Sequence, residues 1–437
     1  MLRILQNQTF ARLFAAQVTA LLGTGLLTIA LALLAYDLAG DRAGVVLGTA
    51  LTIKMVAYVV LSPLAQALTA GLARKSILIG ANIVRGSVAV GLPFVTEVWQ
   101  VYVLIFVLQA ASATFTPTFQ ATIPDVLPDE GDYTRALSLS RLAYEIENIA
   151  SPAVAGLLLT WFSYHWLFLG TVGGFALSAI LVWIAVLPRP AIPKQRPFLS
   201  RLTLGLRIYA GTPRLRGLLA LNLTVAATGS FAIVNTVVLM NGNGPDVAKA
   251  MAGFGLGAIC IALVMPRLLD RIDDRRVMVP AALLAPPVLA ALALILSDGV
   301  EPSLIQIFFV WAVMGALGSA IMTPSARLLR RSAHDEDRAA IFTAQFAASH
   351  GCWLFMYPTA GWTGATFGLS ASAGILAIFA AVGAVLAMRL WPRKTRGPIE
   401  HSHDDLPDDH PHLHGGGHVH RHPIIIDEIH PSWPKSQ

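Results

Sequence analysis

The sequence predicts an all-α integral membrane protein with twelve transmembrane helices in two pseudo-symmetric six-helix halves. Three observations support this fold class. The chain is 55% hydrophobic and only 13% charged, whereas soluble domains carry about 25% charged residues. Its apolar residues form twelve runs that are long enough to cross a bilayer. Its basic residues gather on one side of the membrane that these runs define.

The twelve runs each approach the length that a spanning helix needs, which is about 20 mostly apolar residues for about 30 Å of hydrocarbon. The first run begins at Phe10 and is too long for the apolar part of a signal peptide, so we interpret it as a spanning helix. The runs cover residues 10–36, 44–68, 76–95, 99–121, 136–162, 166–187, 216–240, 247–268, 277–297, 303–325, 339–366 and 370–391.

The distribution of Lys and Arg orients these helices. With the N-terminus in the cytoplasm, 26 of the 31 basic residues fall in cytoplasmic segments. Only Arg42 and Lys249 fall in external loops, while Lys54, Arg85 and Arg141 fall within helices. This bias predicts a multi-pass protein of the plasma membrane, the inner membrane of a bacterium, with both termini cytoplasmic. It also explains the net charge of +6 through contact with membrane lipid rather than nucleic acid.

The motif content argues against an enzyme. No Gly-rich phosphate loop ending in Gly-Lys-Ser/Thr is present, so nothing indicates ATP hydrolysis or a bound cofactor. Cys260 and Cys352 both lie in apolar runs, which excludes a disulfide framework. We expect a monomer that works as a secondary transporter.

The chain divides into two halves that resemble each other weakly. The expected boundaries are 1–187 for the first half, 188–215 for a cytoplasmic linker, 216–391 for the second half and 392–437 for a tail. Phe-Thr-Pro117-Thr in the first half matches Met-Thr-Pro324-Ser in the second, at an offset of about 206 residues. An acidic cluster with an Arg-Ala pair follows each motif, and then a long helix with a late proline. An internal repeat is therefore expected.

The chain resembles the major facilitator superfamily over about residues 1–395. The connection Pro266-Arg-Leu-Leu-Asp270-Arg271-Ile-Asp-Asp-Arg275-Arg276 is similar to the Gly-x-Leu-x-Asp-Arg-x-x-Arg-Arg motif of that family. The resemblance implies a gating role for Asp270, Arg271, Arg275 and Arg276. In the first half, Ala70 and Gly71 replace the acidic and first basic positions, which departs from the family pattern. The resemblance also implies alternating access by movement of the two halves.

Two further segments resemble particular branches of the family. The stretch Ala121-Thr-Ile-Pro-Asp-Val-Leu-Pro with the later Ser151-Pro-Ala-Val-Ala-Gly is similar to the drug-exporter-like branch. Within that branch, the His-rich C-terminus resembles the nickel-resistance exporters.

Ionisable residues inside a span cost about 2.5–3.5 kcal/mol on insertion scales, so each is a candidate site. In the fifth run, Arg141, Glu145 and Asn148 share one helical stripe, and Glu147 points to the opposite side. Arg141 and Glu145 could form a buried ion pair that locks the helix. Alternatively, Glu145 or Glu147 binds a cation and a proton in turn, as a proton-coupled antiporter requires. Both interpretations stay open.

The eleventh run places His350 and Cys352 near its own middle, opposite Glu145 and Glu147 in the repeat alignment. A histidine facing carboxylates at the midplane is a candidate site for a borderline metal ion. Ordinary packing is the alternative, and it is favoured for Cys352 alone. Lys54 in the second run is expected to pair with an acidic residue, either Asp37 or a glutamate of the fifth run.

The last 37 residues contain nine of the twelve histidines. The tail is rich in His, Asp, Pro and Gly, so we expect a disordered extension in which only Ile424–Ile429 is apolar enough to dock. It has no Cys or Met, which argues against Cu⁺ and leaves Zn²⁺, Ni²⁺, Co²⁺ and Cu²⁺ open. A solvated tail without a metal role is the alternative. The candidate ligands are His401, His403, His410, His412, His414, His418, His420 and His422.

The function expected from residues and resemblance together is secondary export of a divalent transition metal ion in exchange for protons, which would confer metal resistance. Nickel is the first expectation, and cobalt or zinc would also suit the tail. Export of a drug or siderophore with an accessory metal-binding tail is one alternative, and a membrane metal sensor without transport is another. In each case the tail is expected to be an accessory metal collector rather than the transport site.

Overall fold

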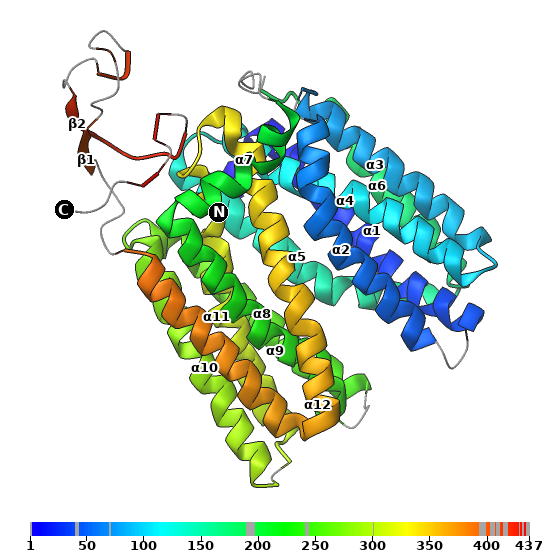
Figure 1. The fold of residues 1–437 in the computed structure, drawn as a ribbon. Helices are drawn as coiled ribbons and strands as arrows, with labels where there is room; N and C mark the ends of the chain where they lie inside the picture. Colours follow the sequence, from blue (N-terminus) through cyan, green and yellow to red (C-terminus); the bar gives the residue numbers. More distant parts are fainter. Residues whose placement is uncertain are drawn as a thin grey trace.

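A computed structural model describes residues 2–39, 43–69, 71–188, 197–240, 244–299 and 301–392 of the helical body (Figure 1). In the tail it describes residues 399–402, 407, 411–413, 418–427, 429–430 and 432–433. Arg42 of the expected external loop and Ala70 of the first-half motif lie outside these ranges.

Long α-helices form both halves. The first half consists of α1 (Gln8–Ala39), α2 (Ala43–Thr69), α3 (Arg74–Gly91), α4 (Val98–Val126), α5 (Glu130–Leu159) and α6 (His165–Ile184). The second half consists of α8 (Pro213–Leu239), α9 (Gly244–Leu269), α10 (Asp274–Ser297), α11 (Leu304–Arg330) and α12 (Arg338–Leu390). Short 3-10 helices lie at Leu2–Gln6 (η1), Leu92–Phe94 (η3) and Asp335–Asp337 (η4).

The described helices make twelve passes, as the sequence predicts. Ten helices are long and apolar enough to span a membrane. One of them, α12, bends at Gly368, where φ is 85°, a backbone region that glycine enters without strain. It therefore supplies both the eleventh and the twelfth pass. The remaining pass is α5, whose charged residues keep it out of the purely apolar set.

The halves are two bundles with a defined seam. In the first half α1 and α3 both pack on α6, and in the second half α8 and α10 both pack on α12. Close approach within the second half depends on Gly257, where a Cβ would lie 1.8 Å from the carbonyl oxygen of Ala312. Between the halves, α2 packs on α12, while α5 packs on α9 and α11. The seam thus consists of helices from both bundles.

The linker contains a helix that the sequence analysis did not identify. Within the expected connection 188–215, α7 (Phe198–Gly211) lies against α12 and α2. We call the end of the bundle that carries α7 and the α11–α12 connection the linker face. The two halves meet at this face and diverge toward the opposite end (Figure 1).

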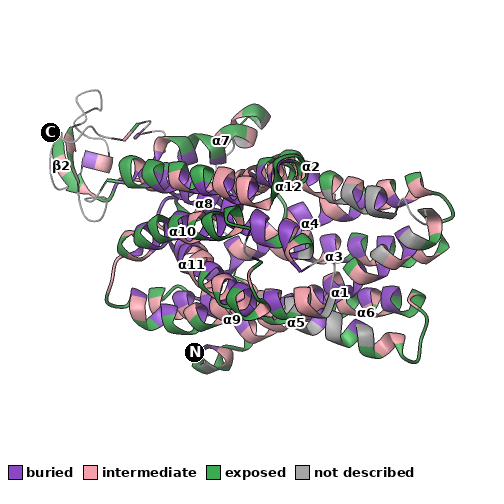
Figure 2. Ribbon diagram, turned by 90° about the horizontal axis from the view of Figure 1, so that it is seen from below, coloured by how far each residue is buried: buried purple, intermediate pink, exposed green. Residues whose placement is uncertain are grey.

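The outer surface of the bundle is apolar. Exposed residues run along the long helices (Figure 2), and large apolar side chains such as Trp183, Phe309 and Ile378 are among them. Large apolar patches that face water are rare on soluble monomers. Lipid therefore accounts for this surface.

The described tail residues form a small ordered unit, which differs from the disordered extension expected for 392–437. β1 (Ile399–Ser402) pairs with β2 (Val419–His422) in an antiparallel ladder, and η5 (Pro411–Leu413) lies between them in sequence. Order is possible because Leu413, Ile424 and Ile426 are buried. Composition alone underestimated how much apolar surface these few residues bury.

Candidate functional site

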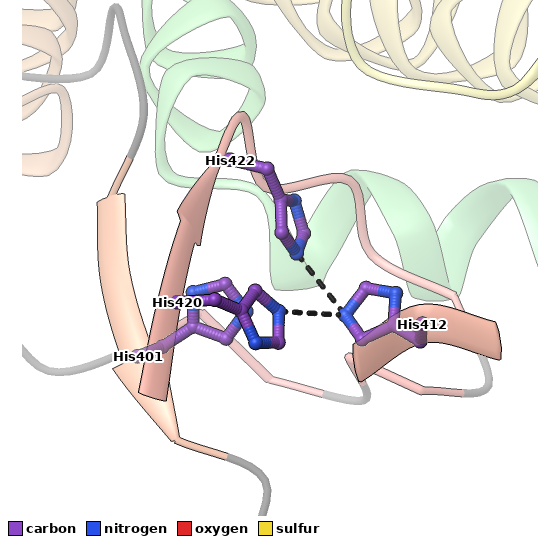
Figure 3. A group of neighbouring side chains, drawn as sticks. All are labelled: His401, His412, His420 and His422. Atoms are coloured by element: carbon purple, nitrogen blue, oxygen red, sulfur yellow. Dashed lines mark hydrogen bonds between the residues drawn. The ribbon is translucent and has the colours of Figure 1, made fainter. Parts of the chain in front are cut away.

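Four histidines of the tail converge on one point. His401, His412, His420 and His422 each direct a ring nitrogen inward, and the four atoms lie within 4.8 Å of one another (Figure 3). The Nε2 atom of His412 lies 3.1 Å from Nε2 of His420 and 3.1 Å from Nε2 of His422. We call this group the histidine centre.

The strand geometry of the tail explains this convergence. Alternate residues of a strand share a face, so His420 and His422 project to the same side of β2. In the ladder His401 stands directly opposite His420 and therefore joins that side. Glu400 and Arg421 also face each other, and the Arg421 Nε–H donates to Glu400 Oε2 at 2.6 Å. That pair fixes the register that brings the histidines together.

The nitrogen atoms of the histidine centre are spaced as ligands of a shared ion would be. An imidazole nitrogen carries either one proton or one lone pair, yet His412 Nε2 faces two other Nε2 atoms at equal distance. Four nitrogens about 2.0–2.1 Å from a common tetrahedral ion would be about 3.3 Å apart. The two separations of 3.1 Å from His412 Nε2 are close to that value, and all four atoms lie within 4.8 Å of one another. The donor set suits Zn²⁺, Ni²⁺, Co²⁺ or Cu²⁺, all of which accept imidazole.

The other predicted tail ligands have different positions. His403, His410 and His414 lie outside the described residues. His418 is described and precedes β2, but it is not part of the converging group. His430, which was not among the predicted ligands, directs Nε2 to within 3.2 Å of His401 Nε2.

Ion pairs join the two halves at the linker face. Asp125, at the end of α4, binds Arg74 at the start of α3. The same carboxylate accepts a bond of 2.7 Å from Arg338 Nη1, at the start of α12 in the other half. We call Arg74, Asp125 and Arg338 the first triad. It ties α12 to the first half.

A second set of ion pairs lies beside the first. Asp274, at the start of α10, accepts a bond of 2.9 Å from Arg331 Nη1, just beyond α11. Glu130, at the start of α5 in the first half, binds Arg331 and also accepts from Arg327 Nη2 at 2.9 Å. We call Asp274, Arg331 and Glu130 the second triad. Two residues of this triad belong to the second half and one to the first, whereas the first triad has two residues of the first half and one of the second.

One of the four predicted gating residues, Arg275, makes a contact at this face, and the neighbouring Asp274 makes another. Asp270, Arg271 and Arg276 are exposed. Arg275 Nε donates to the backbone oxygen of Trp391 at 2.8 Å and so anchors the end of α12. The buried acidic residue of the motif is Asp274. The motif marked this connection, but it did not identify Asp274 as the carboxylate that pairs with Arg331, the arginine that contacts Glu130 of the other half.

Inside the membrane, one cluster joins α2, α5 and α12. The ring of Tyr58 meets the ring of His350 edge-on at 4.7 Å, and Lys54 Nζ lies 5.7 Å from the centre of the same tyrosine ring. Lys54 also interacts electrostatically with Glu147, whose Oε1 accepts from Ser151 Oγ at 3.3 Å. Tyr58 thus joins Lys54 to His350 across the seam, and Glu147 lies within electrostatic range of Lys54.

The tautomer of His350 follows from its backbone contact. Nδ1 lies 2.8 Å from the carbonyl oxygen of Phe346, which can only accept, so the proton is assigned to Nδ1. Nε2 then carries the lone pair that a cation or a proton would take. The ring of Phe346 flanks the imidazole at 4.2 Å.

The remaining predicted intramembrane residues do not complete this cluster. Cys352 packs with Met356 in the apolar core of the second half. Arg141 is partly buried in α5. The side chains of Glu145 and Asn148 lie outside the described part of the chain.

Arg85 is a buried group to which the sequence assigned no role beyond its place in a helix. Its guanidinium lies between the rings of Phe115 and Phe175, 4.2 and 4.5 Å from their centres. It also binds Asn82, whose Nδ2 donates to Ser178 Oγ at 2.9 Å. The two aromatic faces compensate the buried cation. The hydropathy pattern places this arginine inside an apolar helix. Its contacts with the two rings could not be predicted, because they depend on the tertiary fold.

The comparisons with known proteins agree with this architecture. The family model described as Major Facilitator Superfamily matches residues 13–243 and 218–425, one match for each half. The chain therefore belongs to the major facilitator superfamily, and the predicted resemblance is confirmed. Proteins of this family are membrane transporters, which defines the class of this multi-pass protein.

Curated relatives match part of the chain. An uncharacterised MFS-type transporter of Bacillus subtilis, YfiS, is 29% identical over 48% of this chain and 52% of its own length. Macrolide efflux protein A of Streptococcus pyogenes is 29% identical over 41% of this chain and 45% of its length. The chain thus spans about half the length of the curated relatives it matches.

Solved structures match almost the whole helical body. The human organic anion transporter MFSD10 (TETRAN) covers 87% of this chain and 99% of its own, with a TM-score of 0.69 and 14% identity. The Escherichia coli fucose:proton symporter FucP has a TM-score of 0.67 at 15% identity. These similarities establish the fold.

Proposed function

We propose that this transporter is a secondary exporter of a divalent transition metal ion, which it exchanges for protons to confer metal resistance. The convergence of four histidine nitrogens in the tail carries the proposal. With the linker face in the cytoplasm, as the basic residues predict, the histidine centre would meet the ion before export. Nickel comes first because the His-rich tail resembles that of nickel-resistance exporters, and cobalt or zinc would suit the same donors.

The proton exchange would use Lys54, Glu147 and His350. They lie at the seam of the two halves. Alternating access there changes the side of the membrane to which each group is open. Lys54 would hold the Glu147 carboxylate charged while no cation is present. A divalent cation at Glu147 and His350 would repel the neighbouring Lys54 ammonium, whose proton would then be released. Binding of the ion and release of the proton would then be coupled.

The linker-face triads would control access to this cluster. Each triad contains a carboxylate–arginine contact between the halves, Asp125–Arg338 in the first and Glu130–Arg331 in the second. Intact contacts keep the linker face closed. Opening toward the cytoplasm requires both contacts to break, so their strength sets how often the cluster meets cytoplasmic ions.

Export of a drug or siderophore is the second candidate function. The macrolide efflux relatives favour it, and so do the aromatic rings of Tyr58 and Phe346 around His350. Under this alternative, the histidine centre is accessory and expression leaves cellular metal unchanged. A sensor without transport is disfavoured, because it has no need for costly ionisable groups at the seam.

Metal content of expressing cells tests the proposal. Wild type should lower cellular nickel, cobalt or zinc, while Glu147→Gln, Glu145→Gln and His350→Ala should lose most of this effect. Deletion of residues 398–437 should weaken apparent affinity but leave some transport. Glu301→Gln, an exposed glutamate at the opposite end, is the matched control and should behave as wild type. If wild type leaves all three metals unchanged, the metal-export function is wrong.

A further inference from the structure

The segment that follows β2 connects the histidine centre to the helical body. Ile426 is 1% exposed and belongs to the apolar core of the second half. Its Cγ1 atom lies 3.2 Å from the place that a Cβ on Gly211, the last residue of α7, would occupy. Trp433 packs on the same core beneath the guanidinium of Arg214, 5.6 Å from the ring centre. These contacts dock residues 424–433 on the linker face.

Asp427 lies at the middle of this docked segment and binds on two sides. Its Oδ2 atom lies 3.2 Å from Nε2 of His334, in the α11–α12 connection. Its Oδ1 atom accepts from the backbone N–H of His430 at 2.6 Å and lies 3.1 Å from Nδ1 of the same histidine. One carboxylate thus joins the transporter body to His430.

His430 is oriented as a metal ligand would be. A carboxylate on Nδ1 fixes the proton there and leaves the lone pair on Nε2, which is the usual arrangement behind a metal-bound histidine. The Nε2 atom of His430 faces Nε2 of His401 at 3.2 Å. The ring also lies 4.9 Å from that of His412 and 5.0 Å from that of His422. His430 is 5% exposed, so its position is held by packing.

We infer that His430 is a fifth ligand of the histidine centre, and that a bound divalent ion latches residues 424–433 onto the linker face. This inference rests on the proposed metal function of the tail, but not on transport. Five imidazoles exceed the four ligands of a tetrahedral structural zinc site. The centre therefore suits ions that accept more nitrogen donors than zinc does in such sites, Ni²⁺ or Cu²⁺.

The latch acts on the closed state of the transporter. His334, which receives Asp427, lies four residues before Arg338 of the first triad. An ion that fixes His430 fixes Asp427, and Asp427 restrains the α11–α12 connection. The loaded tail thus stabilises the closed linker face, and loss of the ion releases it. Metal occupancy of the tail becomes a regulator of the exporter as well as a store of its substrate.

Nickel binding by the purified full-length protein tests the ligand assignment. Isothermal titration with Ni²⁺ alone should give an affinity for His430→Ala at least about tenfold weaker than wild type, and Asp427→Asn should lose about 10–100-fold through the orientation of His430. His165→Ala, an exposed histidine at the opposite end, should bind as wild type. Wild-type affinity in His430→Ala would overturn the assignment.

Hydrogen exchange tests the latch separately. Ni²⁺ should slow exchange of residues 424–430 in wild type and leave it fast in His430→Ala. His334→Ala should lose most of this protection and weaken nickel binding less than His430→Ala does, because the contact with the body is removed while all the histidine ligands remain. Protection that does not depend on Ni²⁺ would overturn the latch. Both readouts are independent of transport, so cells without metal export would refute the proposed function and leave the latch standing.

Discussion

The two triads at the linker face occupy equivalent positions with opposite charges. Each consists of the first residue of the third helix of one half, a residue at the end of its fourth helix, and the first residue of the fifth helix of the other half. The first triad has Arg74, Asp125 and Arg338 at these positions. The second has Asp274, Arg331 and Glu130. The two halves share the same pattern of contacts, but the residue at each equivalent position has the opposite charge.

The triads differ in how far water reaches the cross-half contact. In the first, the side chains of Asp125 and Arg338 are 14% and 10% exposed. In the second, the side chain of Glu130 is 46% exposed. A buried charge that loses its partner is costly, whereas an exposed ion pair contributes little. The comparison indicates that the first triad holds the halves together and that the second mainly adjusts their alignment.

Helix polarity increases this difference. The start of an α-helix carries partial positive charge, which favours an acidic residue and disfavours a basic one. Glu130 at the start of α5 therefore suits its position, while Arg338 at the start of α12 opposes it. Arg338 depends on Asp125 more than Glu130 depends on Arg331.

The largest expected effect comes from Asp125→Asn. This change removes the carboxylate partner of Arg74 in a buried place and leaves Arg338 paired with the exposed Asp335 alone. Breaking a buried ion pair costs about 3–5 kcal/mol, or a shift of more than about a hundredfold toward the open linker face. Spin labels at Leu72, which is exposed, and at Glu336, which is partly exposed on this face, should report a longer distance. The native cysteines are replaced by serine in all proteins compared.

Two further variants show whether charge is the cause. Asp132→Asn removes an exposed carboxylate that pairs locally with Arg135, and it should leave the label distance unchanged. The triple variant Arg74→Asp, Asp125→Arg and Arg338→Glu gives the first triad the signs of the second, and it should restore most of the closed population. If the triple variant is as open as Asp125→Asn, the sign symmetry of the triads has no structural meaning.

Glu130→Gln should have a smaller effect that depends on salt. An exposed pair contributes at most about 1 kcal/mol, and screening is nearly complete at about 1 M salt, where the Debye length is about 3 Å. The same labels should report a slight opening at low ionic strength that disappears at high ionic strength. The effect of Asp125→Asn should persist in high salt. Equal salt sensitivity of the two variants would contradict the assigned roles.

The sequence predicted the transporter fold because that fold depends on local composition. Hydropathy identified every pass, including α5, although its charges keep it out of the purely apolar helices. Both Asp125 and Asp274 stood in recognised motifs. Their partners were not predictable, because the contacts of Arg338 and Glu130 span about 200 residues and depend on how two separate bundles meet.

The histidine centre shows what a local pattern can and cannot reveal. The alternation His420-Arg421-His422 is typical of one face of a strand, so it could have indicated that two ligands share a side. The contribution of His401 depends on strand register, and that of His430 depends on the turn at Asp427. Composition marked the tail as a candidate metal-binding segment but did not reveal its geometry.

The smallest expected effect concerns pH and the contact between the tail and the α11–α12 connection, which leads into Arg338 of the first triad. The hydrogen bond with Asp427 raises the pKa of His334 despite its partial burial, and the charges of Asp427, Asp337 and Glu336 add to the rise. Docking therefore favours the protonated imidazole. Its contribution is complete below the pKa of the undocked side chain and is lost as pH rises through the docked value.

Hydrogen exchange of residues 424–430 in metal-free protein should accordingly become faster between about pH 6 and pH 8, the range in which histidine titrates, after correction for the intrinsic rate. His334→Gln should remove this dependence, because a neutral amide cannot be protonated there. Nickel should reverse the trend, since metal binding competes with protons and strengthens as pH rises. A chelator must therefore be present in the first measurement. A faster exchange at high pH that persists in His334→Gln would place the titrating group elsewhere and remove the link between the tail and the first triad.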